Sequence, residues 1–245
     1  MAKRPKNGVC VHCLESFEED TWDHVFPESW YPKSTPENLE KWKIPSCEKC
    51  NREYGKMERE MLQHLGLAVN PDNIASSGIP EKVHRALDKN QGHSEKDSSA
   101  REKAKEKIAS KLIEVTAEYE SGVFPSLDPH EYEEGARKMG IPIDAEWFER
   151  LSIKIVKGVT YLETGKLIDE PYEITYGVLR EEPDNPILKA VQQFGKVEYR
   201  GPGLRIGKAR TGEDPIQSVW IIDIWQQFRL YAFVLDKNAK KQRGY

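Results

Sequence analysis

Hydrophobic residues recur at helical spacing in three stretches of the chain. The stretch CEKCNREYGKMEREMLQHL, residues 47–65, places Met and Leu side chains on one face, and Gly66 marks the expected end of this helix. Residues 98–119 and 144–165 have the same period, and Asp144 is a candidate N-cap for the later helix. The expected buried face of that helix consists of Trp147, Phe148, Leu151, Ile155 and Val159.

Other stretches predict connections and strands. Residues 67–80 are rich in turn formers and predict a loop, whereas residues 81–89 predict a short helix. After residue 165, apolar and polar positions alternate, which predicts strands with one short helix at 186–194. The strand candidates are YEITYGVLR (172–180), KVEYR (196–200), LRIGKAR (204–210), SVWIIDIW (218–225) and FRLYAFVL (228–235).

These patterns predict an α+β protein in three parts. We expect a small N-terminal module at residues 1–66, a helical connector at 67–143 and a mixed α+β domain at 144–245. The longest apolar runs are far shorter than the roughly 18 residues of a membrane helix. The opening MAKRPKNG is not followed by the apolar region of a secretory signal. We therefore expect a cytoplasmic protein with no membrane partner.

The charge is unevenly distributed along the chain. The net charge of −4 divides into −2 for residues 1–65, −6 for 66–149 and +4 for 150–245. The chain as a whole does not have the basic surface typical of nucleic-acid-binding proteins. Any contact with a nucleic acid must therefore depend on local basic patches.

The cysteines form two C-x-x-C pairs, Cys10 with Cys13 and Cys47 with Cys50. A C-x-x-C turn directs two thiolates at one ion, and two such turns complete the tetrahedral sulfur shell of a structural Zn²⁺. Without a secretory signal, this spacing favours a metal site over disulfides. Because four sulfurs suffice, His12, which lies inside the first pair, is expected to face solvent.

The segment between the cysteine pairs contains side chains suited to catalysis. Asp23 and His24 are adjacent in TWDHVFPESW, so in an extended chain they point to opposite sides. Asn38 is the one asparagine between His24 and the second pair, and Asn51 follows Cys50 directly. Trp22, Trp30, Tyr31 and Trp42 flank this segment and are expected to supply apolar core.

The order C-x2-C, DHVFP, an Asn-Leu pair and C-x2-C-N resembles the HNH endonuclease family over about residues 8–62. The resemblance implies a ββα-metal fold with a four-cysteine zinc site. It implies that His24 is the general base that deprotonates the attacking water. It also implies that Asp23 and Asn51 bind a catalytic Mg²⁺ or Mn²⁺.

Asn38 matches the residue that braces the loop and orients the base in this family. Its distance of nine positions from Cys47 is longer than the family pattern. The implied function is metal-dependent hydrolysis of DNA, with RNA as an alternative substrate. Restriction, phage biology and antiphage defence are common settings for proteins that resemble this one. The C-terminal domain would then bind substrate, a protein partner or a signal.

A second hypothesis is a non-catalytic, zinc-stabilised module that binds nucleic acid or protein. The set of Asp23, His24, Asn38 and Asn51 favours the nuclease, because a binding module does not need this combination. The predicted helix at residues 47–65 carries three basic residues near its start, Lys49, Arg52 and Lys56. They are candidates for contacts with phosphates or, alternatively, ordinary solvated residues. The basic segment 196–210 predicts a hairpin that lies along a nucleic-acid groove or, alternatively, a charged sheet edge.

Overall fold

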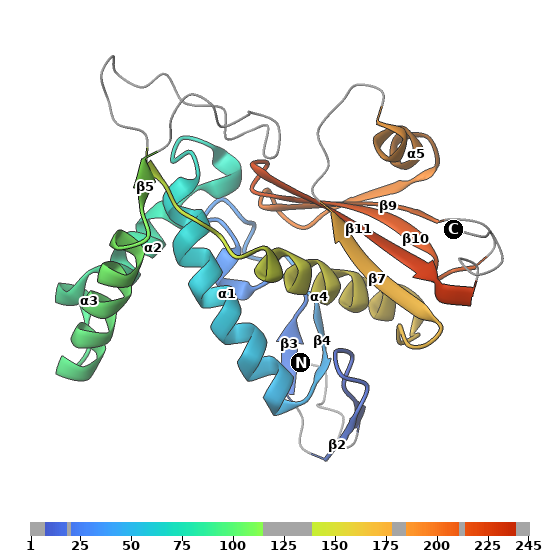
Figure 1. Cartoon of the computed structure of the whole chain (residues 1–245), viewed down its shortest axis with the longest axis horizontal. Helices are drawn as coiled ribbons and strands as arrows, with labels where there is room; N and C mark the ends of the chain where they lie inside the picture. The colour runs from blue at the N-terminus through green and yellow to red at the C-terminus, as the bar shows by residue number, and fades with distance from the viewer. Residues whose placement is uncertain (1–7, 19–20, 115–138, 178–184, 211–213, 239–245) are drawn as a thin grey trace.

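The computed structural model describes residues 8–18, 21–114, 139–177, 185–210 and 214–238 (Figure 1). The described residues form helices and antiparallel sheets, which confirms the predicted mixed α+β class. Within the described ranges, no helix combines the length and the apolar character needed to cross a membrane.

The N-terminal part contains two small antiparallel sheets and a long helix. Strands β1 (Gly8–Val9) and β2 (Ser16–Phe17) form the first sheet, and the first cysteine pair lies in and beside the turn between them. Strands β3 (Thr21–His24) and β4 (Lys43–Ser46) form the second sheet. Helix α1 (Glu48–Ala68) follows β4 almost at once and packs against β3.

Helix α1 begins where the cysteine spacing predicts and ends later than expected. Cys47 is its N-cap, and the Sγ of Cys47 accepts a hydrogen bond from the backbone N–H of Cys50. The prediction that Gly66 ends the helix is wrong, because α1 continues past it. A Cβ at Gly66 would lie 2.6 Å from Cγ2 of Val83, so the glycine allows helix α2 (Ile79–Leu87) to approach closely.

The connector is more helical than the sequence predicts at its start and less so at its end. The 67–80 segment, predicted as a loop, contains the end of α1, a 3₁₀ turn at Ile74–Ser76 and the beginning of α2. Helix α3 (Glu95–Ala109) is capped by Ser94 and is shorter than the predicted 98–119 helix, whose last residues lie outside the described ranges. Strands β5 (Ile113–Glu114) and β6 (Met139–Gly140) then pair.

Helix α4 (Ala145–Thr164) is the central element of the molecule (Figure 1). Its predicted N-cap is confirmed, since the Asp144 side chain accepts a hydrogen bond from the backbone N–H of Glu146. Its predicted apolar face is buried, with Trp147 only partly covered. Gly165, at φ 68°, ends the helix in the left-handed region that favours glycine.

The C-terminal part is a five-stranded antiparallel sheet in the order β7-β11-β10-β9-β8. Its strands are β7 (Tyr172–Gly177), β8 (Lys196–Tyr199), β9 (Leu204–Arg210), β10 (Ser218–Ile224) and β11 (Phe228–Asp236). All five were predicted from alternation, although residues 178–180 of the first lie outside the described ranges. The predicted hairpin at 196–210 is present as the β8–β9 pair.

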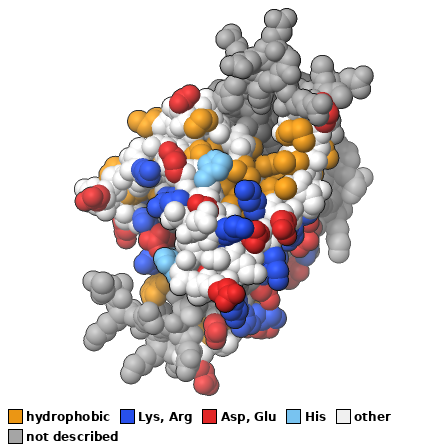
Figure 2. All heavy atoms as spheres, turned by 90° about the vertical axis from the view of Figure 1, so that its left-hand side faces the viewer, with side chains coloured by type: hydrophobic (Ala, Val, Ile, Leu, Met, Phe, Trp, Pro, Cys, Tyr) orange, Lys and Arg blue, Asp and Glu red, His pale blue; other side chains and the backbone are white. Residues whose placement is uncertain are grey.

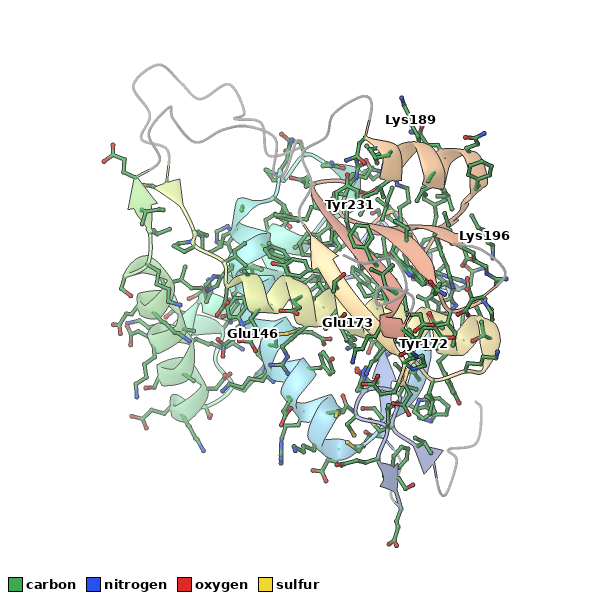
Figure 3. All side chains as sticks on the ribbon, turned by 45° about the vertical axis from the view of Figure 1, so that its right-hand side comes forward. Glu146, Tyr172, Glu173, Lys189, Lys196 and Tyr231 are labelled. Atoms are coloured by element: carbon green, nitrogen blue, oxygen red, sulfur yellow. The ribbon has the colours of Figure 1, made fainter. Side chains whose placement is uncertain are left out.

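Alternate residues of this sheet pack on two different helices. Ile222 on β10 faces the large core shared with α4, whereas Ile221 packs with Val191 of helix α5 (Pro186–Phe194) on the other face. Tyr231 of β11 also lies on the α5 side (Figure 3). The predicted helix at 186–194 is thereby confirmed.

One continuous core joins the N-terminal and C-terminal parts. It contains Val25 and Ile44 of the β3–β4 sheet as well as Ile155 of α4. It extends to Trp225, whose indole N–H donates to the backbone oxygen of Trp30 at 2.8 Å. The three-part division of the chain stays a prediction, but the outer two parts share apolar packing.

Candidate functional site

The four cysteines converge as the C-x-x-C spacing predicts. One Sγ from each of Cys10, Cys13, Cys47 and Cys50 lies within 4.8 Å of all the others. A tetrahedral zinc with Zn–S bonds of about 2.3 Å separates its sulfurs by about 3.8 Å. The Sγ atoms of Cys13 and Cys47 are 3.9 Å apart. The cluster therefore has the dimensions of a site that could hold a zinc ion.

The pKa values of the cysteine thiols also indicate that the cluster needs a cation to become fully ionised. Burial acts to raise the pKa of the Cys10 thiol, but hydrogen bonds from the backbone N–H groups of Cys13, Cys47 and His12 outweigh it and lower that pKa to about 7. Burial and the neighbouring sulfurs raise the pKa of Cys50. Four thiolates at this spacing repel one another, so a bound cation is what allows all of them to ionise.

The β3–β4–α1 unit brings three of the four predicted catalytic residues together. Asp23 and His24 end strand β3 and have their side chains on opposite sides, as an extended chain requires. Asn51 lies in the first turn of α1, and its Nδ2 donates to the backbone oxygen of Trp22 at 3.4 Å. Asn51 is thus held against the strand that carries Asp23 and His24.

The fourth residue, Asn38, lies elsewhere on the connection between β3 and β4. It is exposed, and no hydrogen bond from its side chain to His24 occurs within the described ranges. The candidate phosphate-binding residues Lys49, Arg52 and Lys56 are all exposed on α1. Their exposure leaves both interpretations of these residues open.

Asp23 is only 5% exposed and belongs to a buried charge cluster. His12 Nε2 donates to Asp23 Oδ2 at 2.9 Å, and Lys154 Nζ donates to Asp23 Oδ1 at 2.9 Å. Lys154 also forms an ion pair with Glu58 of α1. The prediction that His12 faces solvent is wrong, because its imidazole is buried between Asp23 and the ring of Tyr54.

The contacts of this cluster change the acidity of its members. Burial acts to raise the pKa of Asp23, but the hydrogen bond from His12 and the charge of Lys154 hold it below its usual value. Burial raises the pKa of Glu58, and the charge of Lys154 opposes that rise. Burial lowers the pKa of His12, which favours the neutral imidazole. The cluster is therefore organised around the positive charge of Lys154.

His24 lies on the more open side of β3. Its side chain is 19% exposed, and its Nε2 is 3.8 Å from Oε2 of Glu28. Burial lowers the pKa of His24, and the charge of Glu28 opposes this shift. Within the described part of the chain, Nε2 has no hydrogen-bond partner. His24 is therefore a neutral base whose lone pair or N–H is not used in holding the fold.

A divalent cation does not fit Asp23 in this arrangement. Mg²⁺ binds oxygen at about 2.0–2.1 Å in an octahedral shell and keeps several waters. Both carboxylate oxygens of Asp23 already accept hydrogen bonds, and the ammonium of Lys154 lies against one of them. The zinc cluster thus fits its implied metal, whereas Asp23 does not fit the catalytic Mg²⁺ or Mn²⁺ implied by the resemblance.

Acidic side chains pair with four basic residues of the segment 196–210. Lys196, which is labelled in Figure 3, and Arg200 both pair with Glu198. Lys208 pairs with Glu163 at 2.7 Å, and Arg205 pairs with Asp223. Strand β8 is an edge of the sheet, which favours the charged-edge interpretation over a groove-binding hairpin.

Other surfaces likewise carry mixed charge. Figure 2 shows the face that includes α3, where Lys and Arg side chains are interspersed with Asp and Glu around a hydrophobic patch. A groove between α2 and α3 on this side is lined in part by Leu67, Leu87 and Ile108. A uniformly positive field of the kind that attracts a nucleic acid is not found on this face.

Comparisons of the chain with protein-family models, with curated proteins and with solved structures found no match. The site must therefore be interpreted from its own geometry. Lys154 is its most important member that the sequence pattern did not reveal. Its position on the apolar side of an amphipathic helix, between Leu151 and Ile155, was the available signal that it is buried with an acidic partner.

Proposed function

We propose that the chain is a nuclease of the HNH type that hydrolyses phosphodiester bonds in DNA, with His24 as its general base. The observation that carries this proposal is the arrangement of β3, β4 and α1 around the cysteine cluster. His24 ends β3, Asn51 lies one residue after Cys50, and both are fixed to a framework that a zinc ion would rigidify.

The environment of His24 suits proton transfer from water. An ordinary histidine has a pKa near 6.5, and burial lowers this value, so His24 is neutral at pH 7. Nε2 is buried and lies 3.8 Å from Oε2 of Glu28, whose side chain is 59% exposed, so the proposal requires side chains around Nε2 to move before water reaches it. A general base of this kind contributes roughly 10²–10⁴-fold to a rate.

The proposed substrate contact involves the exposed first turns of α1. Lys49, Arg52 and Lys56 extend from the helix that carries Asn51 and are candidates for binding phosphates beside His24. The acidic balance of the chain limits the affinity for free DNA. Regulation by a partner that binds the C-terminal part is consistent with this balance.

The proposal is tested by nicking of supercoiled plasmid by the full, zinc-loaded chain. Wild type, His24→Ala and the exposed control His84→Ala are compared with and without added Mg²⁺ or Mn²⁺. We expect wild type and His84→Ala to cut, and His24→Ala to lose at least 100-fold in rate while retaining its zinc. Equal cutting by all three proteins would refute the role of His24. Single-stranded DNA and RNA tested in parallel identify the substrate.

A second function is favoured by one observation, the saturation of Asp23 by His12 and Lys154. A non-catalytic, zinc-stabilised module that binds nucleic acid or protein would retain such a buried carboxylate for structural reasons. This alternative predicts binding of DNA or RNA without cleavage under any metal condition. It also predicts that His24→Ala leaves the binding affinity unchanged.

A further inference from the structure

Lys154 has an unusual position for a lysine. It is 0% exposed, comes from the middle of α4 and extends into the space between β3 and α1. Lysine is almost never fully buried without a partner, because its charge loses several kcal/mol of hydration. Here it has two partners, since Nζ contacts Asp23 and Glu58, and it also lies 5.2 Å from the centroid of the Tyr54 ring.

The charges of the cluster show why a cation is required at this point. Asp23 and Glu58 bring two carboxylates into the core, from β3 and α1 respectively. His12 Nε2 donates a hydrogen bond to Asp23 Oδ2 at 2.9 Å. The ammonium of Lys154 contacts both carboxylates and supplies the positive charge between strand and helix that compensates them.

We propose that Lys154 is the resident cation of the β3–β4–α1 unit, so that Asp23 serves as a structural partner of α4 and not as a ligand of a divalent metal. Lys154 is then a positioning residue. It fixes Asp23, and through the backbone of β3 it fixes the neighbouring His24. This inference rests on the proposed nuclease function, because only that function leads one to expect a metal ligand at Asp23.

The packing of α4 holds Lys154 in place beside Asp23. Leu151 and Ile155, its neighbours on the buried side of α4, are both fully buried in the main core. A Cβ at Gly158 would lie 2.8 Å from Cγ2 of Val25, so the helix is in close contact with the chain just after β3. Moving α4 away from the β3–β4 sheet, so that Lys154 left Asp23, would expose this apolar surface to water.

A second lysine of α4 also holds this helix against the N-terminal part of the chain. Lys157, three positions after Lys154, donates to the backbone oxygen of His12 at 2.6 Å. The imidazole of that same His12 donates to Asp23. Helix α4 therefore holds both the first cysteine turn and the end of β3 through its lysines.

The inference is tested by Mn²⁺ binding to the full, zinc-loaded chain, with free Mn²⁺ followed by electron paramagnetic resonance. The variants are Asp23→Asn, Lys154→Gln and the double variant with both changes. We expect Asp23→Asn to change the affinity of otherwise wild-type protein for Mn²⁺ by less than twofold. We expect Lys154→Gln to bind Mn²⁺ at least tenfold more tightly than wild type, and Asp23→Asn to abolish that gain.

Two results would overturn the inference. A tenfold loss of Mn²⁺ affinity on Asp23→Asn in otherwise wild-type protein would show that Asp23 already binds the metal. A folded Lys154→Gln variant without added Mn²⁺ affinity would show that the ammonium does not occupy a cation position. If Lys154→Gln does not fold, Lys154→Gln with Glu58→Gln removes one charge of each sign and is measured in its place. Because this test measures metal binding, its failure is distinct from a failure of the plasmid-nicking test of His24.

Discussion

Lys154 Nζ lies 2.9 Å from Asp23 Oδ1, although the two residues are 131 positions apart in the sequence. The contact connects the motif segment to a helix that the sequence places in a different part of the chain. Because Lys154 is fully buried, removing it leaves two carboxylates in the core without their cation. The N-terminal unit and α4 are therefore expected to fold as one structure.

Replacing Lys154 by Met should destabilise the protein by about 3–5 kcal/mol, the usual cost of leaving a buried charge without its partner. The measurement is the free energy of unfolding in urea. Lys107→Met is the control, since Lys107 is exposed and its ion pair with Glu60 is worth at most about 1 kcal/mol. Adding Glu58→Gln to Lys154→Met should recover part of the loss, and strict additivity of the two changes would contradict the coupling.

Gly158→Ala should destabilise the protein by about 1–2 kcal/mol although alanine favours helices. The new Cβ would lie 2.8 Å from Val25 and 3.2 Å from Ile44, so the β3–β4 sheet must move away. Gly55→Ala on α1 is the matched control, because nothing lies within 4 Å of its new Cβ. That control should stabilise by about 0.5–1 kcal/mol. Thermal melts compare the two, and a stabilised Gly158→Ala would refute the close contact.

Cys47→Ser should abolish metal binding at the cysteine cluster and lower the melting temperature strongly. Cys47 contributes one sulfur of the cluster and also caps α1, and because serine is a good N-cap residue, Cys47→Ser keeps the cap and removes only the thiolate ligand. Structural zinc sites contribute about 10–16 kcal/mol of folding energy in small peptides, which sets the scale of the effect. Zinc content by mass spectrometry and a thermal melt test this. A variant that retained one zinc per chain and full stability would exclude the cluster as the metal site.

His64 should make stability fall as the pH falls. It is buried on α1, where its Nδ1 donates to the backbone oxygen of Pro142, and burial lowers its pKa, with Lys107 and Lys111 adding to the shift. A base with a lowered folded pKa binds fewer protons when folded. Its contribution is therefore complete above pH 6.5 and is lost as the pH falls through the folded pKa.

Urea unfolding of wild type and His64→Gln between pH 7.5 and 5.5 measures this contribution. We expect a smaller decrease for His64→Gln than for wild type. Part of the decrease should remain, because burial also lowers the pKa of His24. Parallel curves for the two proteins would show that His64 does not titrate differently on folding.

Much of this fold follows from local patterns in the sequence. Alternation located all five strands of the C-terminal sheet, and the 3.6-residue period located α4 with its cap at Asp144. The cysteine spacing likewise predicted the cluster, because two C-x-x-C turns have few other ways to bring four sulfurs together. The sequence pattern failed at Gly66, where close packing against α2 favours a glycine inside a helix.

The partners of the candidate site could not be predicted in this way. His12, Glu58 and Lys154 lie on three different elements, and their meeting depends on how α4 crosses the β3–β4 sheet. Sequence spacing contains no information about such long-range contacts. The motif alone predicted the role of Asp23, and it did not reveal that Lys154 donates a hydrogen bond to one of the carboxylate oxygens of Asp23.

The central claim, that His24 is the base of a nuclease, is tested most directly by chemical rescue. The rate of plasmid nicking by zinc-loaded His24→Ala is measured with and without added imidazole. We expect imidazole to raise the nicking rate of His24→Ala at least tenfold and to leave the rate of wild type unchanged. Nicking by His24→Ala at the wild-type rate, before any imidazole is added, would contradict it.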